Sequence, residues 1–432
     1  MNKDEASTPR PARKRRWLLG LSIGFLVLLL LLALAVQQIL QPRFATRLIL
    51  REAGQALGLD ITATGEPELQ LRGTPRWVIR GVSAKLPGTQ RELLRAERIL
   101  LSLPWSTLKS RGQLLDIDRV ELDAPVLDLA VLAEWRKSRP PTEQQRLPTL
   151  TRGLQVTKGQ VLGNGWRVEG ININLPRFAP EQPLHAQASG RYVARTLQLP
   201  FDLHLALSKP ADNAALGLVG DITPTASDWK MPMRIRLSAP MHWGDDGLRL
   251  TPAKLGAKVR YEGRNGDPIP FAFGAYGPAR VSTDGLHWPS LTLALRADGV
   301  VPNLDAVGSL EAGKELQLRL AGQIQAWPDA WPQLPKPLSD SRSPLPFTLD
   351  YVGAFDFSDV FALGVRRDAT RFDGRLHVRD VLAWRDAASA GSPIPPIDGR
   401  LITPKLEIAG AQLEGVEVEI EAPSVPPTDT VP

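Results

Sequence analysis

The sequence predicts a mainly β protein: one N-terminal transmembrane helix, then an extended antiparallel β-sheet curled into an apolar groove, with a few short helices. Three observations predict it. Residues 17–36 form a long apolar run without a charge. From Leu59 onward, apolar and polar residues alternate with a period of two, which is typical of strands with one buried face. Gly, Pro, Asn and Asp separate the alternating runs, where hairpin turns need them.

The apolar run extends from Trp17 to Val36, and Ser22 is its only clearly polar residue. A helix of this length spans the roughly 30 Å hydrocarbon core of a bilayer. The basic tail before it, residues 1–16, favours a cytoplasmic N-terminus, so the rest of the chain is expected to be exported. A cleavable signal peptide is the alternative, since Ala33-Leu34-Ala35 resembles a cleavage site, although a signal's apolar region is usually about 7–15 residues long.

Composition excludes several classes of function. The 432 residues contain no cysteine, which rules out disulfides, a cysteine nucleophile and thiolate metal sites. The formal net charge is +6. Six basic residues against Asp4 and Glu5 give +4 within the first sixteen positions, so the exported part is close to neutral. The excess of basic residues therefore indicates the orientation of the chain in the membrane, and no nucleic-acid partner is expected.

A short helix is expected directly after the membrane segment. Pro42 is suited to a helix start, and Gly58 to the position just past a helix end. Arg43, Arg47 and Arg51 lie four residues apart and therefore share one helical face. They are candidates for contact with anionic lipid head groups of the inner membrane, and a solvated basic face is the alternative.

Shifts in composition divide the remaining chain into regions. The expected regions are a helix with the first strands (43–130), a short helix and linker (131–150), a β-rich groove (151–325), a Pro-rich linker (326–346), a C-terminal β region (347–422) and a disordered tail (423–432). No repeat of fixed period is visible, which argues against a propeller or a solenoid with a fixed motif.

The clearest alternation marks the candidate lipid-binding residues. These residues occupy one face of a single predicted strand: Leu197, Leu199, Phe201, Leu203, Leu205 and Leu207. An apolar sheet face must be covered, by a second sheet, by closure into a filled barrel, or by an apolar ligand in an open trough. Strand patterning does not choose among these, but a membrane anchor places acyl chains nearby and favours the trough. A phospholipid is the expected partner.

The search for catalytic or metal-binding motifs finds none with the required spacing. No H-E-x-x-H or G-x-S-x-G motif occurs, and no pair of histidines has the spacing of metal ligands. An acidic cluster matches the solvent side of alternating strands better than a calcium loop: Asp116, Asp118, Glu121, Asp123 and Asp128. We therefore expect no enzyme activity, no cofactor and no metal.

The N-terminal region resembles a known family. The resemblance rests on the helix ending in Leu57-Gly58, the strand through Arg80-Gly81-Val82, the run L-x-A-x-x-I-x-L-x-L from Leu94 to Leu103, and the pattern from Ile117 to Leu129. In this order, behind an apolar anchor, these motifs resemble the AsmA family of bacterial envelope proteins. The likeness is good over about 110 residues and weak over the rest.

The resemblance implies a function and a location. It implies a single-pass inner-membrane anchor, a periplasmic β-rich groove related to chorein-type lipid carriers, and a role in phospholipid transport and outer-membrane biogenesis. Since the family has no agreed catalytic motif, it implies no catalytic residue. The alternative is a non-enzymatic assembly factor that contacts other envelope proteins, including outer-membrane proteins, through exposed strand edges.

Overall fold

The computed structural model describes residues 42–110, 116–138, 148–195, 197–244, 246–263, 267–282, 284–329, 331, 339, 341, 343–386, 396–408 and 411–421. The predicted membrane segment 17–36, the basic tail 1–16 and the tail 423–432 lie outside these residues, as do parts of the predicted linkers 131–150 and 326–346. Among the described helices, none combines the length and the hydropathy needed to cross a bilayer.

The described chain contains four helices, labelled α2 to α5. Helix α2 (Pro42–Leu57) ends where predicted, because Gly58 takes the left-handed conformation with φ +57°. Helix α3 (Trp105–Lys109) is a single turn. Helix α4 (Leu129–Lys137) begins at an aspartate cap: Asp128 Oδ1 accepts from the backbone N–H groups of Ala130 (2.9 Å) and Val131 (3.1 Å). Helix α5 (Val378–Asp386) follows the third strand from the C-terminal edge.

The rest is β-structure. The strands are β1 (Asp60–Ala63), β2 (Glu68–Gln70), β3 (Arg76–Lys85), β4 (Glu92–Ser102), β5 (Asp116–Ile117), β6 (Arg119–Asp123), β7 (Val126–Asp128), β8 (Thr149–Leu150), β9 (Leu154–Leu162), β10 (Trp166–Leu175), β11 (Leu184–Ala194), β12 (Leu197–Leu207), β13 (Asn213–Ile222), β14 (Trp229–Lys230), β15 (Met233–Gly244), β16 (Gly247–Gly263), β17 (Ile269–Ser282), β18 (Gly285–Ala297), β19 (Leu304–Ala312), β20 (Leu316–Ile324), β21 (Leu345–Gly353), β22 (Phe361–Arg367), β23 (Thr370–Leu376), β24 (Ile397–Ile408) and β25 (Ala411–Ile420).

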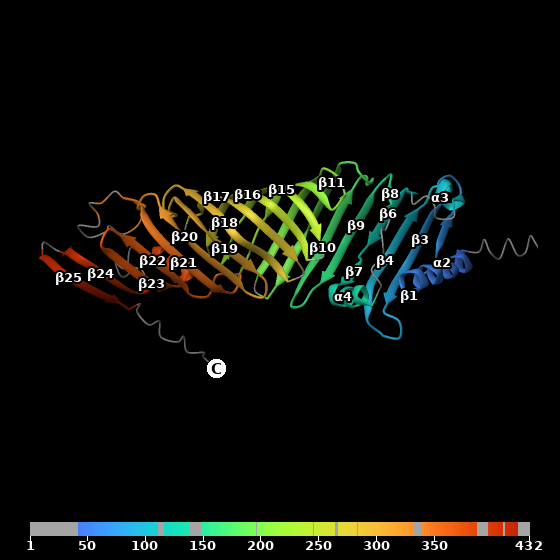
Figure 1. The fold of residues 1–432 in the computed structure, drawn as a ribbon. Coiled ribbons are helices and arrows are strands. Elements are labelled where there is room, and N and C mark those ends of the chain that lie inside the picture. Colours follow the sequence, from blue (N-terminus) through green and yellow to red (C-terminus); the bar gives the residue numbers. More distant parts are fainter. Residues whose placement is uncertain are drawn as a thin grey trace, which may run out of the picture.

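All of these strands except β5 and β8 belong to one sheet. Strands β1 and β2 both pair with β3 at one edge, and from β9 onward each long strand pairs with the next along the chain until β25 at the other edge. The result is a long meander that follows the order of the chain (Figure 1). The mainly β fold with few short helices is therefore confirmed.

The predicted antiparallel pairing holds for most of the sheet but not for all of it. Strands β6 and β7 pair with β9 in parallel, and β5 pairs with β8 in parallel. The reason lies in the connection between β7 and β9, which contains α4. A parallel pair needs such a crossover, whereas a tight hairpin joins only antiparallel neighbours. The sheet is therefore mixed, and its parallel pairing lies where α4 connects β7 to the strands that follow.

An ion pair between two segments that follow distant strands shows that the sheet curls. Arg379 Nε of α5 lies 3.2 Å from Asp228 Oδ2 in the loop before β14. Strands β13 and β23, which precede these two segments, are nine pairing steps apart in the sheet. In a flat sheet nine steps of about 4.8 Å would separate them by about 43 Å. The contact exists because the sheet bends back toward its own middle.

The C-terminal region differs from the prediction in one element. The alternation Phe372-Gly374-Leu376 continues in sequence to Val378, which predicts a strand through that residue. Strand β23 instead ends at Leu376, and Val378 begins α5. The backbone N–H groups of Asp380 and Val381 both donate to the carbonyl of His377, which shows the chain turning into the helix at this point.

Candidate functional site

Register brings the apolar positions of successive strands into continuous rows. The first apolar row runs from β3 to β21, and each member is the direct cross-strand neighbour of the next. Its members are Ile79, Ile99, Leu122, Val156, Ile173, Ala188, Leu203, Gly220, Ile235, Ala257, Phe273, Leu295, Leu304, Ile324 and Leu345. No member carries a polar side chain, and none is exposed.

A second apolar row lies two residues away on the same face. It runs from β11 to the C-terminal edge, and its members are Ala186, Leu205, Leu218, Leu237, Leu255, Ala275, Leu293, Ala306, Gly322, Phe347, Val365, Phe372, Leu401 and Val418. Again every member is buried or half-buried. Fourteen steps of about 4.8 Å give the first row a length of roughly 67 Å along the sheet. Together the rows form a continuous apolar face.

The six residues predicted to bind lipid lie on this apolar face. Leu203 belongs to the first row and Leu205 to the second, and the other four have the same alternation on β12. All six are half-buried, whereas the alternate residues from Gln198 to His204 are exposed. Within β10, β11 and β12, Leu184 is the only buried residue. The apolar face of these three strands is therefore partly accessible.

Helices cover the apolar face at its N-terminal end. Leu50 of α2 packs on Trp77, Ile79 and Val82 of β3. Val131 and Trp135 of α4 belong to a second cluster with Leu59 and Ala84, and Trp135 Nε1 donates to the carbonyl of Leu57 at the end of α2 (2.8 Å). The partly accessible segment thus lies between this covered end and the central core.

The central core lies further along the same face. It includes Leu216, Ala253, Trp288, Leu320 and Phe347, which are all buried. Leu205 and Leu207 pack against this core from its N-terminal side. The apolar face therefore passes without interruption from the partly accessible strands into a buried interior.

Local chemistry on this face favours uncharged groups. Burial raises the pKa of Tyr192 above its ordinary value of 10.0, because desolvation disfavours the charged phenolate. Tyr192 is the cross-strand neighbour of Leu199 and lies 5.5 Å, between ring centroids, from Trp166. The two aromatic rings enlarge the apolar surface of β10 and β11 beside the predicted residues.

The structure does not test the role predicted for the three arginines of α2. Arg51 is exposed on the helix, and the side chains of Arg43 and Arg47 lie outside the described residues. Their contact with lipid head groups stays a prediction.

Asp118, one member of the acidic cluster, has a structural role. Arg152 Nε donates to Asp118 Oδ1 (2.8 Å), and Ser102 Oγ donates to Asp118 Oδ2 (2.9 Å). The hydrogen bond from Arg152 first, and that from Ser102, hold the pKa of Asp118 below its ordinary value of 3.8, although burial opposes this. Asp118 and Ser102 are buried, so this aspartate ties β4 to the turn before β9.

Two more members of the acidic cluster, Glu121 and Asp123, are bound by Arg98. Its Nη1 donates to Glu121 Oε2 (3.1 Å) and to Asp123 Oδ2 (2.8 Å), and these carboxylates raise the pKa of Arg98. Asp128 is the cap of α4. Across the described part of the chain, no group of three or more His, Asp or Glu side chains is placed to hold a metal ion.

Sequence reasoning missed the continuity of the two rows from β3 to β25. The signal was present as alternation in each strand, but the register that aligns one strand with the next is a property of the folded sheet. Comparison with models of protein families, with curated proteins and with solved structures finds no match to this chain.

Proposed function

We propose that this chain is a membrane-anchored lipid-binding and lipid-transfer protein of the bacterial periplasm, in which residues 17–36 form the anchor. The observation that carries the proposal is the apolar face of β10–β12, which is half-buried and lies in line with the rows on either side. Each methylene moved from water to such a face contributes about 0.8 kcal/mol, so a chain of about 14 methylenes gains roughly 11 kcal/mol.

The rows also support transfer along the sheet. An acyl chain that moves from one strand to the next meets only apolar side chains or glycine in both rows. Movement without a polar barrier needs no chemical step. Phospholipid transport toward the outer membrane, the role that the resemblance to the AsmA family implies, needs a path of this kind.

The test is co-purification of lipid with the full-length protein in detergent. Mass spectrometry of the wild type should detect bound phospholipid. Leu203→Asp and Leu205→Asp should each remove most of it, because a charge in the rows would have to be desolvated beside the acyl chain. Gln198→Asp is the matched control, since it adds the same charge to an exposed position of the same strand. A folded wild-type protein without bound lipid would contradict the proposal.

The C-terminal edge favours a second candidate function, assembly of envelope proteins. Strand β25 pairs with β24 on one side, and no other described strand pairs with it. Leu413 on this strand is 44% exposed. An edge strand of this length is a template for strand addition by a partner protein. A photo-crosslinker at Leu413 should capture a protein in cells under this function, while Leu203→Asp should have no effect on assembly.

A further inference from the structure

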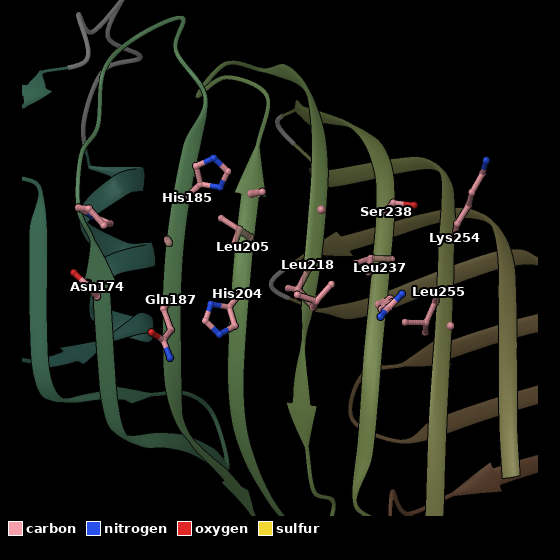
Figure 2. A pocket seen from close by; sticks show the side chains of 17 residues that line it. Asn174, His185, Gln187, His204, Leu205, Leu218, Leu237, Ser238, Lys254 and Leu255 are labelled. Atoms are coloured by element: carbon pink, nitrogen blue, oxygen red, sulfur yellow. The ribbon is translucent and has the colours of Figure 1, made fainter.

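The polar face of the sheet carries a groove that the lipid-binding proposal does not use. It has a volume of about 800 Å³ and crosses β10 to β16. Two lines of side chains flank it: His185, Ser238 and Lys254 lie on one side, and Gln187 and His204 on the other (Figure 2). These residues alternate with Leu205, Leu237 and Leu255 of the second apolar row, so the groove lies on the opposite face.

Small residues form the floor of this groove. Ala206, Gly217 and Gly256 lie along it on neighbouring strands. A Cβ atom added to Gly256 would meet nothing within 4 Å, and one added to Gly217 would meet only the Ala206 carbonyl, at 3.9 Å. Neither glycine has a left-handed φ, so the backbone does not require glycine there. The effect of these glycines is to keep the floor open.

The two cations at one end of the groove differ from the arginines around them. In the described structure neither Arg236 nor Lys254 has a carboxylate partner. The other arginines of β15, β16 and β17 each have one. These pairs are Arg234–Asp221 (3.0 Å), Arg249–Asp246 (2.7 Å), Arg260–Glu262 (2.6 Å) and Arg280–Asp246 (3.4 Å). The arginines around the groove are therefore paired with carboxylates, whereas Arg236 and Lys254 at the groove are not. Among the described residues Lys258 of β16 also has no carboxylate partner, so the unpaired positive charge extends two residues beyond Gly256.

Register places these two cations within reach of one anion. Arg236 is directly opposite Gly256, and Lys254 is two residues from that glycine. Such diagonal neighbours lie about 7–8 Å apart, which two long side chains can bridge through a shared ligand. No Asp or Glu lines the groove, and the one acidic residue of β12, Asp202, accepts a hydrogen bond from Gln187 (3.0 Å).

The other end of the groove suits a small organic group. His185 and His204 flank it there, and Val219 beside them is 45% exposed. Five strand steps from β10 to β16 give the groove a length of about 24 Å. An anion alone would occupy only the Arg236 end, so the remaining length has room for the organic part of a larger ligand.

We propose that this outer groove binds a phosphate ester, with the phosphate between Arg236 and Lys254 and its organic part over Gly217 and Ala206. The guanidinium of Arg236 supplies two parallel donors that match two phosphate oxygens, and Lys254 adds a point charge. The proposal concerns the opposite face from the lipid-binding rows and does not depend on them.

The experiment is a calorimetric titration of the full-length protein in detergent with two soluble probes. Glycerol 3-phosphate represents a free phosphate monoester, and glycerophosphoglycerol represents a lipid head group without acyl chains. We expect saturable binding of at least one probe. Tighter binding of the diester would identify a lipid head group as the source, and tighter binding of the monoester a soluble ester.

Three substitutions test the site. Arg236→Gln and Lys254→Gln should each weaken binding at least tenfold. Gly256→Val should abolish binding by filling the floor while leaving the fold intact, because its added atoms enter open space and valine suits a strand. Lys314→Gln, at an exposed turn position, is the charge-matched control and should leave binding unchanged.

Two results would overturn the proposal. One is a folded wild type that binds neither probe. The other is equal weakening by Lys314→Gln and Arg236→Gln, which would show only general attraction to a basic surface. Leu203→Asp should keep probe binding, so failure of the lipid-binding proposal and failure of this one are distinguishable.

Discussion

Trp77 Nε1 of β3 donates a buried hydrogen bond to Thr46 Oγ1 of α2, at 3.0 Å. This bond fixes the helix that follows the predicted membrane segment onto the first strand of the apolar face. Trp77 and Ile79 lie on the same side of β3, and Ile79 begins the first apolar row. The packing of α2 on β3 thus fixes the position of α2 beside the start of the first apolar row.

Thr46→Val should destabilise this end of the protein. The substitution keeps the shape of the side chain but leaves the buried indole N–H without its acceptor, which costs about 1–3 kcal/mol. Urea unfolding followed by tryptophan fluorescence should show the lower stability. Thr62→Val, at an exposed position of β1, is the control and should change stability little. Equal stability of both variants would contradict a role for this bond.

A charge in the middle of the rows should block transfer. Leu293 lies in the second apolar row on β18, and Thr292 is its exposed neighbour on the other face. Leu293→Lys is expected to slow movement of fluorescent phospholipid between vesicles at least tenfold, because each lipid would have to pass a desolvated ammonium group. Thr292→Lys adds the same charge to the polar face and should transfer at the wild-type rate. Equal rates for both variants would exclude the rows as the path.

The ion pair between Arg379 and Asp228 should hold the curl of the sheet. The chain has no cysteine, so spin labels at Ser227→Cys and Ala383→Cys would be the only ones present. Both positions are exposed and lie near the ion pair without forming it. Arg379→Ala should broaden the measured distance distribution and shift it to longer distances. Because the pair is partly exposed, high salt should have a similar but smaller effect. An unchanged distribution would assign the curl to strand twist alone.

Stability should depend on pH through Asp118. Its pKa in the folded protein is lowered, so the ionised form contributes stability above the unfolded pKa of about 3.9. This contribution is lost as the pH falls from there through the lower folded value. Asp118→Asn should cost about 1–3 kcal/mol at pH 7, because Arg152 and Ser102 lose a charged acceptor. The difference between variant and wild type should shrink below about pH 4; a constant difference would contradict this assignment.

The alternation of β12 is strong enough to predict its partly buried face from sequence. Leu197 to Leu207 contribute six apolar positions of period two, and each is half-buried while its exposed neighbours are polar or proline. The start and end of α2 were also predictable, because Pro42 and Gly58 act through local backbone preferences.

Features that depend on distant partners were not predictable. The parallel pairing of β6 with β9 depends on where α4 returns the chain, and Val378 continues the strand pattern in sequence although it begins a helix. The outer groove is a similar case. Gly217 and Gly256 read as interruptions of strands, and the lack of a partner at Arg236 is visible only when neighbouring arginines are seen with theirs.

The order of the strands in the sheet follows their order in the chain, and this has a consequence for the length of the apolar rows. From β9 onward each long strand pairs with the next along the chain, so every added hairpin lengthens the apolar rows by two steps, or about 10 Å. Such an insertion needs no new contact with the rest of the fold, only one new pair of edges. The strand count therefore sets the length of the apolar rows, and duplication or loss of a hairpin would change that length while leaving the other strand pairings unchanged.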